Sequence, residues 1–212
     1  MILQNVTDVT PEIVAAARDS LLAGGVALVP TDTVYGLAVA AGRPSAAARI
    51  FALKNRPAAK NLPIMVAGVD QLPSLGVVVT PDARKLLDAF APGPITIAFG
   101  VDPAAAPEWL AGRDEIAVRV PKEEALLAIL RETGPLLVTS ANAHAQETPE
   151  TVPDILAMLD GEPDVVLDGG PRQSVPSTLV NCNLPVPRIE RVGQIPADRI
   201  EKVLHSAEKV LS

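Results

Sequence analysis

Short apolar runs alternate with helical patterns along the whole chain, and this alternation limits the possible fold more than any other feature. Thr10-Pro11-Glu12 is typical of a helix start, because it joins an N-cap hydroxyl, a proline in the first turn and an acid at the positive end of the helix dipole. Apolar residues at helical spacing follow, and Gly24-Gly25 ends the helix. The apolar run 26–29 then predicts a buried strand.

The same alternation predicts the remaining elements. We expect helices over residues 45–53, 80–90, 123–130, 153–159 and 196–211. We expect strands over residues 62–66, 95–99, 116–120, 136–138, 165–167, 178–180 and 188–192. Interleaved strands and helices indicate an α/β fold. The close spacing of strands in the last third favours a mixed sheet over a purely parallel one.

Length and composition fit one domain over residues 1–212. The chain is 48% hydrophobic, and its 21 prolines are spread along it rather than gathered in a linker. The formal net charge is −7, so the chain as a whole repels nucleic acid, which argues against a general RNA-coating role. The net charge does not exclude a cleft whose lining is locally positive.

The number of cysteines and the first residues of the chain indicate the cellular compartment in which the protein is found. Cys182 is the only cysteine, which excludes an internal disulfide and a cysteine-based metal cluster and fits a reducing cytoplasm. No zinc or EF-hand spacing occurs, so we expect no protein-built metal site. Residues 1–8 lack a basic region followed by an apolar run, so we expect no signal peptide. No apolar stretch reaches the roughly 18 residues that cross a bilayer, so we expect a cytoplasmic protein without membrane contact.

A first polar segment, residues 30–37, directly follows the strand over 26–29. It carries two hydroxyls, a carboxylate and a phenol. Ligand sites in α/β sheets lie outside the carboxyl ends of strands, so this loop is well placed for binding. The alternative is an ordinary polar turn in which Asp32 or Thr33 caps a helix. Chemistry alone leaves both interpretations open.

A second segment, Lys54-Asn55-Arg56-Pro57 with Lys60 behind it, places three cations within seven residues. Lys54 falls at a helix end, where a cation is favourable without any ligand. That explains one charge but not three. Arginine offers a planar fork and lysine a compact charge, and a polyanionic ligand would use both.

A third segment, residues 139–142, follows the apolar strand 136–138. Its hydroxyl and amide side chains can bind phosphate oxygens or a ribose, or they can cap their own loop. Ser140 as a nucleophile would need a base nearby. His144 lies in the same polar loop and His205 in the terminal helix, so a Ser–His hydrolase is not favoured.

Three further positions stand out. Arg119 lies within an apolar strand, where a charge is costly unless it is paired. Ser177 begins another strand, and Arg191 precedes Val192-Gly193. A strand arginine is more often part of a structural ion pair than a ligand contact. Neither a phosphate-binding G-x-x-x-x-G-K-[ST] loop nor a dinucleotide-binding G-x-G-x-x-G motif is present.

Taken in order, seven stretches of the chain resemble the YrdC-like threonylcarbamoyl-AMP synthases. They are PTDTVYGL (30–37), KNRP with Lys60 (54–60), APGPITI (91–97), AVRVP (117–121), TSAN (139–142), PSTLV (176–180) and RVGQI (191–195). They span nearly the whole chain.

The resemblance implies a twisted mixed α/β sheet around a large, concave, locally cationic cavity. There, L-threonine and bicarbonate would form a carbamate that attacks the α-phosphate of ATP, giving threonylcarbamoyl-AMP and pyrophosphate. Mg²⁺ is expected on the phosphates, held by ATP and water. A downstream threonylcarbamoyl transferase complex would then modify tRNA, and tRNA itself is a further candidate partner.

The resemblance also implies residue roles. Thr33, Arg119 and Ser177 match positions that bind threonine. Lys54, Arg56, Ser140 and Asn142 match the catalytic Lys-x-Arg and Ser-x-Asn elements. The expected ATP contacts are Arg56, Lys60, Ser140, Asn142, Thr148 and Arg191. Such a reaction needs positioning and charge neutralisation more than a protein nucleophile, in agreement with the lack of a nucleophile–base pair.

The chain departs from the family pattern at several places. They are Met65 in place of a common histidine, Ala143-His144 in place of Ser-Gly, a glycine-free stretch over 173–175, and Asn181 in place of an acid. These changes bear on the nucleotide lid and the rate more than on the fold. The chain also ends about where this domain ends, so we expect no extra C-terminal domain.

Two alternatives remain, and the second belongs to a different class of protein. One is a paralogue that keeps the cavity but makes another acyl or carbamoyl adenylate. The other is a non-catalytic RNA-binding module, although the net charge of −7 and 2% aromatic content count against stacking platforms. A purely structural role would leave the converging cations without a purpose.

Overall fold

The computed structural model describes residues 1–6, 9–55, 61–144 and 146–206. In these ranges helices α1 to α6 cover Pro11–Leu22, Pro44–Leu53, Pro81–Phe90, Glu124–Thr133, Val152–Met158 and Ala197–Leu204. Strands β1 to β11 cover Ile2–Asn5, Ala27–Val29, Gly36–Ala40, Ile64–Met65, Val77–Val78, Ile95–Val101, Glu115–Arg119, Leu136–Ser140, Val165–Asp168, Thr178–Asn181 and Arg188–Arg191. Two 3₁₀ helices, η1 and η2, cover Val69–Leu75 and Glu108–Leu110.

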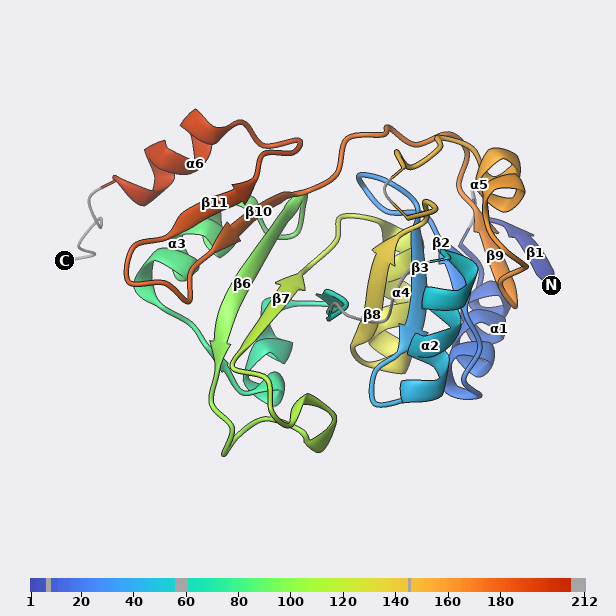
Figure 1. The fold of residues 1–212 in the computed structure, drawn as a ribbon, viewed down its shortest axis with the longest axis horizontal. Coiled ribbons are helices and arrows are strands. Elements are labelled where there is room, and N and C mark those ends of the chain that lie inside the picture. Colours follow the sequence, from blue (N-terminus) through green and yellow to red (C-terminus); the bar gives the residue numbers. More distant parts are fainter. Residues whose placement is uncertain (7–8, 56–60, 145, 207–212) are drawn as a thin grey trace.

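The described strands form one twisted sheet in the order β1-β9-β2-β3-β8-β4-β7-β6-β10-β11, with β5 beside β6. Figure 1 shows it running from β1 on the right to β11 on the left. The pairs β1–β9, β2–β9, β4–β7 and β6–β10 are parallel, and the other pairs are antiparallel. The predicted mixed α/β sheet is therefore confirmed.

Alternating side chains give the β2-β3-β8 part of the sheet two buried faces. Leu28 and Leu37 belong to the larger apolar cluster, together with residues of α2 and α5. Ala27 and Ala38, one position away, belong to a second cluster with α1 and α4. This period of two is the geometry of a strand covered on both sides. Figure 1 shows α2 in front of these strands and α4 behind them.

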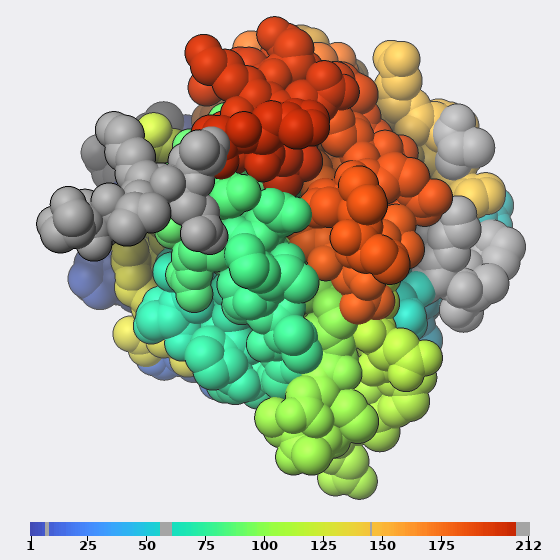
Figure 2. Space-filling model, turned by 90° about the vertical axis from the view of Figure 1, so that its left-hand side faces the viewer, coloured from blue at the N-terminus to red at the C-terminus, as the bar shows by residue number. Residues whose placement is uncertain are grey.

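Two helices cover the other half of the sheet. Helix α3 packs against α6, and α3 also contacts β6. Figure 2 views the molecule from the left-hand side of Figure 1 and shows α3, in green, next to α6, in red. Cys182, just after β10, is buried in the same apolar cluster as residues of both helices, and its burial, with a smaller effect of Asp82, raises the pKa of the thiol to about 12.

Threonine hydroxyls start three of the helices. The side chains of Thr10, Thr80 and Thr151 accept hydrogen bonds from backbone N–H groups at the first turns of α1, α3 and α5. Each of these helices also has a proline in its first turn. The predicted starts at Thr10 and Thr80 are therefore confirmed, since hydroxyl caps and early prolines act together at helix starts.

The prediction missed three strands and was too long in one helix. The missed strands are β1, an edge strand with mostly exposed side chains, β3, which begins with glycine directly after a polar loop, and the two-residue β5. Helix α6 ends at Leu204, not at residue 211: the backbone N–H of Ser206 donates to the carbonyl of Val203, three residues back, so the α-helical i→i−4 pattern is broken there. The rest of that prediction lies in residues 207–211, outside the described ranges. None of the helices in those ranges has the length and hydrophobicity to cross a bilayer.

We predict that Leu37→Ala destabilises the protein by about 2–5 kcal/mol, because it opens a hole between the sheet and α2. Leu37 is fully buried, whereas Leu3 on the edge strand is 59% exposed. Leu3→Ala is therefore the matched control and should change the unfolding free energy by less than about 0.5 kcal/mol. Urea unfolding followed by circular dichroism measures both, and equal losses would contradict this packing.

Candidate active site

A cavity of about 400 Å³ lies where the polar segments meet. Its walls come from the loop between β2 and β3, the ends of β7 and β8, the loop after β8, β6, and the β10–β11 pair. The lining residues are Thr31, Thr33, Val34, Tyr35, Gly36, Pro63, Met65, Thr96, Ala117, Arg119, Val138, Thr139, Ser140, Asn142, Gln146, Glu147, Thr148, Ser174, Pro176, Ser177, Leu179 and Arg191. Segments far apart in the chain thus share one hollow.

Arg119 is buried at the end of β7 with three protein acceptors. Its Nε donates to the carbonyl of Gly93 at 3.1 Å, its Nη1 to the hydroxyl of Thr33 at 2.9 Å, and its Nη2 to Asp32 Oδ1 at 2.6 Å. The residue is 5% exposed, and burial lowers the pKa of Arg119 while Asp32 opposes that shift. The ion pair therefore holds the guanidinium in place at the cavity wall, as the cost of burying a charge requires.

The hydroxyl of Thr33 has a fixed hydrogen-bond direction. Thr31 Oγ1 donates its only proton to the carbonyl of Val34 at 2.6 Å. The 3.0 Å contact between the hydroxyls of Thr31 and Thr33 must then be donated by Thr33. Because Arg119 also donates to Thr33, the Thr33 oxygen keeps one free lone pair and no proton. It can accept from a ligand but cannot donate.

Arg191 is fixed against the start of β10. Its Nε donates to the Ser177 carbonyl at 3.0 Å and its Nη2 to the Ser177 hydroxyl at 3.2 Å. Burial lowers the pKa of Arg191. The chain can pass this close because residue 193 is glycine: a Cβ there would lie 2.2 Å from the carbonyl oxygen of Pro176. The RVG and PST motifs are thus in direct contact.

Asn142 is a hub on the other side of the cavity. Its Oδ1 accepts from Lys54 Nζ at 3.2 Å, from Thr148 Oγ1 at 3.4 Å, and from the hydroxyl of Ser140. Its Nδ2 donates to the carbonyls of Ala143 and Gln146 at 2.9 and 2.6 Å. The carboxamide therefore connects the end of β8 with residues 143, 146 and 148 of the following segment.

Lys54 joins α2 to that loop. It caps the C-terminal end of α2, is 2% exposed, and also donates to the carbonyl of Ser140. The backbone N–H of His144 in turn donates to the Lys54 carbonyl at 3.0 Å. Lys54 is consequently buried behind the cavity wall formed by Ser140 and Asn142.

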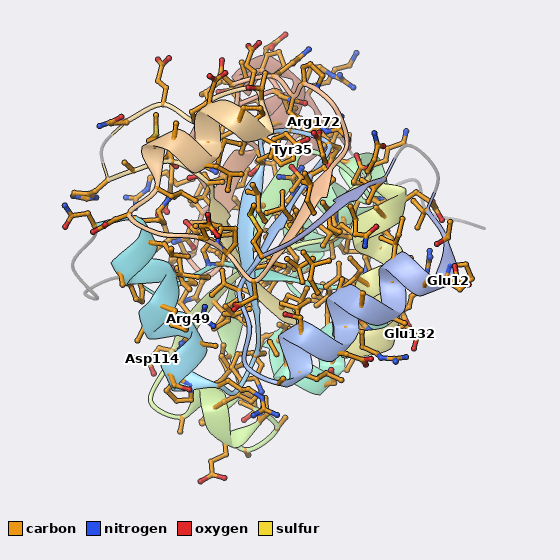
Figure 3. The ribbon with its side chains drawn as sticks, turned by 90° about the vertical axis from the view of Figure 1, so that its right-hand side faces the viewer. Glu12, Tyr35, Arg49, Asp114, Glu132 and Arg172 are labelled. Carbon is orange, nitrogen blue, oxygen red and sulfur yellow. The ribbon has the colours of Figure 1, made fainter. Side chains whose placement is uncertain are left out.

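Tyr35 and Arg172 connect the loop between β2 and β3 with the segment after β9. The Tyr35 phenol donates to the Gly170 carbonyl at 2.7 Å and accepts from the Gly169 N–H at 3.0 Å. Burial raises the pKa of this phenol. Arg172 lies 6.0 Å from the Tyr35 ring centre and forms a 3.0 Å ion pair with Glu123. Figure 3 shows Tyr35 and Arg172 side by side.

The structure brings most of the predicted site residues together. Those that line the cavity are Thr33, Arg119, Ser140, Asn142, Thr148, Ser177 and Arg191, and Lys54 contacts two of them. Arg56 and Lys60 lie outside the described residues. Among the departures, Met65 and Ser174 line the cavity, whereas Asn181 donates to Glu115 and Glu190 within the sheet.

Several lining residues were not singled out from the sequence. Thr96 is a buried polar residue in an otherwise apolar strand and contacts the hydroxyl of Ser177 at 2.8 Å. That isolated hydroxyl was a usable signal. Gln146 and Glu147 gave none, since polar residues in a loop are ordinary.

The charges that line the described cavity walls are two arginines, Arg119 and Arg191, and one carboxylate, Glu147. No group of three or more His, Cys, Asp or Glu side chains that could hold a metal occurs in the described part of the chain. Because two guanidiniums converge from different strands, the arrangement suits an anionic ligand.

Comparison with known proteins identifies the family. The Sua5/YciO/YrdC family profile, described as "Telomere recombination", matches residues 19–193. The chain belongs to this family. Curated relatives include the threonylcarbamoyl-AMP synthase of Bacillus subtilis, 33% identical over 93% of this chain and 60% of the relative. That of Pyrococcus abyssi is 32% identical over 85% of this chain and 54% of the relative. The chain thus spans less than two thirds of the length of these relatives.

Solved structures of the Sua5/YciO/YrdC family agree. P. abyssi Sua5 complexed with L-threonine has a TM-score of 0.88 at 30% identity, covering 97% of this chain and 61% of that one. E. coli YciO has a TM-score of 0.81 at 25% identity, covering 92% and 96%. The twisted mixed sheet with flanking helices is therefore the family fold.

We predict that Asp32→Ala destabilises this family member by about 3–5 kcal/mol, because it leaves the buried Arg119 charge unpaired. The double variant Asp32→Ala/Arg119→Met should recover part of the loss, since no charge then remains buried. Glu124→Ala is the control, because its ion pair with Arg131 is more than half exposed and should contribute less than about 1 kcal/mol. Chemical unfolding of all variants tests this, and a loss for Asp32→Ala no larger than for Glu124→Ala would contradict it.

Proposed function

We propose that this chain is an L-threonylcarbamoyladenylate synthase, a nucleotidyltransferase. The observation that carries the proposal is the single cavity in which Arg119 of β7, Ser140 of β8, Arg191 of β11 and Ser177, the residue before β10, meet. The names of the relatives and the L-threonine complex of P. abyssi Sua5 support the choice of reaction.

The proposed reaction has two steps. The amine of L-threonine combines with bicarbonate to give a carbamate and water. A carbamate oxygen then attacks the α-phosphorus of ATP, pyrophosphate leaves, and threonylcarbamoyl-AMP is formed. No step needs a covalent protein intermediate, so the residues must position the reactants and neutralise charge.

We assign the threonine to the wall formed by Thr33, Arg119 and Ser177. The described residues accept three of the five guanidinium N–H groups of Arg119, which leaves two for a carboxylate. The free lone pair of Thr33 suits a donor on the substrate, either the ammonium or the hydroxyl. Ser177, 4% exposed, offers a further hydroxyl at the same wall.

We assign the nucleotide to the wall formed by Ser140, Asn142 and Thr148, with Arg191 on the phosphates. Three donors already converge on the Asn142 carboxamide oxygen, and a phosphate oxygen could take over some of them. Lys54 would act from behind this wall by fixing Ser140 and Asn142. Arg56 and Lys60 keep their proposed role in binding ATP.

Mg²⁺ belongs to the proposal as an ion carried by ATP. The described residues supply no cluster of protein ligands for it, and Glu147 is the one carboxylate among the described lining residues. The phosphates and water would therefore provide most of its ligands, as is usual for this ion. Bound in this way, Mg²⁺ would neutralise charge on the leaving pyrophosphate.

The wider setting follows from the product. We propose that residues 1–212 form a single domain in the cytoplasm and that a threonylcarbamoyl transferase complex uses the adenylate to modify tRNA. The continuous sheet from β1 to β11 supports the single domain. tRNA itself is a further candidate partner, although the net charge of −7 opposes attraction to its phosphates.

The direct test is incubation with ATP, bicarbonate and L-threonine, with mass spectrometry to detect the adenylate and a pyrophosphate assay for the rate. We predict that Arg191→Gln lowers the rate about a hundredfold, since it removes a preorganised positive charge beside the phosphates. Arg188→Gln is the matched control on the same strand, because Arg188 is exposed and pairs with Glu190. It should leave the rate unchanged.

Lys54→Ala and Arg56→Ala extend this test to the Lys-x-Arg element. Unchanged turnover in both variants would overturn the assignment of the nucleotide site. Pyrophosphate release that is equally fast with other amino acids would favour a paralogue with a different adenylate. Binding of tRNA without any adenylate formation would favour the RNA-binding alternative.

We predict that Thr33→Val raises the KM for threonine about tenfold or more, while Thr33→Ser stays within a few-fold. Valine removes the oxygen that accepts from the substrate, and serine keeps it. The kcat should change less than the KM, because the contact is made in both ground and transition states. Equal effects of serine and valine would contradict a hydrogen bond to the Thr33 hydroxyl.

A further inference from the structure

A second cavity, of about 320 Å³, lies between α2 and the segment that holds η2. Its lining residues are Gly42, Arg43, Pro44, Ala47, Ala48, Phe51, Asn61, Leu62, Trp109, Arg113 and Leu137. None of them lines the active-site cavity. Figure 1 shows η2 as the lime helical turn at the bottom of the molecule, below β7, with α2 to its right. We call this hollow the α2–η2 cavity.

Two aromatic rings line the α2–η2 cavity. Trp109 is the only tryptophan of a chain that is 2% aromatic, and Phe51 comes from the last turn of α2. The indole is held against the turn before α2: a Cβ at Gly42 would lie 3.4 Å from Trp109 Cδ1, and Gly42 has a φ of +75°. Leu62, Leu137 and Ala47 add further apolar surface, and Asn61 adds one uncharged polar side chain. Such walls suit a flat, apolar ring.

The charges around the α2–η2 cavity are positive. Arg43 occupies the N-cap position of α2 and makes no capping hydrogen bond with its side chain, and the positive end of the helix dipole adds to its charge. Arg113 has a buried Nη1 atom without a hydrogen-bond partner in the described part of the chain. No carboxylate is among the lining residues that the structure describes. The local charge of this cavity is therefore positive, opposite to the net charge of the chain.

Arg113 is in an unfavourable state as it stands. A buried guanidinium N–H that lacks an acceptor loses its hydration without compensation. The described residues form no ion pair with Arg43 or Arg113, in contrast to the ion-paired Arg119 and Arg172. A small rotation of the Arg113 guanidinium toward the cavity would therefore give Nη1 an anionic acceptor without breaking any described side-chain hydrogen bond.

We propose that the α2–η2 cavity binds a small anion that carries an aromatic ring. The ring packs against Trp109 and Phe51, and the carboxylate or phosphate lies between Arg113 and the N-terminal end of α2 with Arg43. The cavity volume is at the lower end of the range for small-molecule sites. This inference does not rest on the proposed synthase activity.

Trp109 is a reporter for its own cavity, because no other tryptophan contributes to the emission. The test is a titration of tryptophan fluorescence with benzoate, phenyl phosphate and benzamide, an uncharged analogue of benzoate. We expect a saturable change with at least one anion, and binding of benzamide weaker by about tenfold or more. Comparison of benzoate with phenyl phosphate distinguishes a carboxylate from a phosphate ligand.

Variants locate the site. Arg113→Met keeps most of the apolar stem of the side chain and removes the charged guanidinium, and it should weaken binding of the anion by about tenfold. Arg113→Lys restores a charge and should recover most of the affinity, which separates a ligand contact from a folding defect. Arg131→Met, an exposed arginine on α4, and Arg191→Met, in the active-site cavity, should leave the titration unchanged.

The proposal is overturned by any of three results: no saturable change with either anion, equal affinity for benzamide, or loss of the signal in Arg191→Met but not in Arg113→Met. None of these outcomes involves turnover. A negative result in this titration therefore does not contradict the proposed synthase activity, and a negative adenylate assay does not contradict binding at the α2–η2 cavity.

Discussion

Burial of the Arg119 guanidinium is the constraint on which the cavity depends. A charge that is 5% exposed needs acceptors, and the nearest ones come from two other segments, the loop after β2 and the turn before β6. Asp32 supplies the compensating charge, Thr33 a hydroxyl and Gly93 a carbonyl. Two other segments are thereby held against β7, so one wall of the cavity forms as a consequence of satisfying a single side chain.

The opposite wall depends on a neutral group. The Asn142 carboxamide accepts from Lys54 and Ser140 on its oxygen and donates to two backbone carbonyls from its nitrogen. Aspartate could not donate, and a hydrophobic residue could do neither. The buried ammonium of Lys54 would then lose an acceptor. Rigidity on this side therefore arises from an amide that satisfies both kinds of partner, and α2 is tied to β8 through it.

The sequence predicted that these residues lie in one cavity, but it did not predict which side chains pair with one another. Apolar periodicity and threonine caps located most helices and strands, because those signals are local. The exposed edge strand β1 and the two-residue β5 carried no such signal, whereas the apolar run of β3 directly follows a polar loop that was interpreted through residue 37 as one binding segment. Pairing of Asp32 with Arg119 spans 87 positions, and the direction of the Thr33 hydroxyl depends on Val34 and Thr31 together. Such contacts are set by tertiary packing, which no local pattern encodes.

Fixed hydrogen-bond directions divide the cavity chemically. The hydroxyl of Thr33 donates to a protein acceptor, so it presents only a lone pair to a ligand. Arg119 and Arg191 present only donors. A molecule with both an ammonium and a carboxylate would therefore be oriented by the cavity: its negative end faces the guanidiniums and its donor end faces the Thr33 oxygen. Reversal would leave like groups facing each other, which costs the desolvation of both.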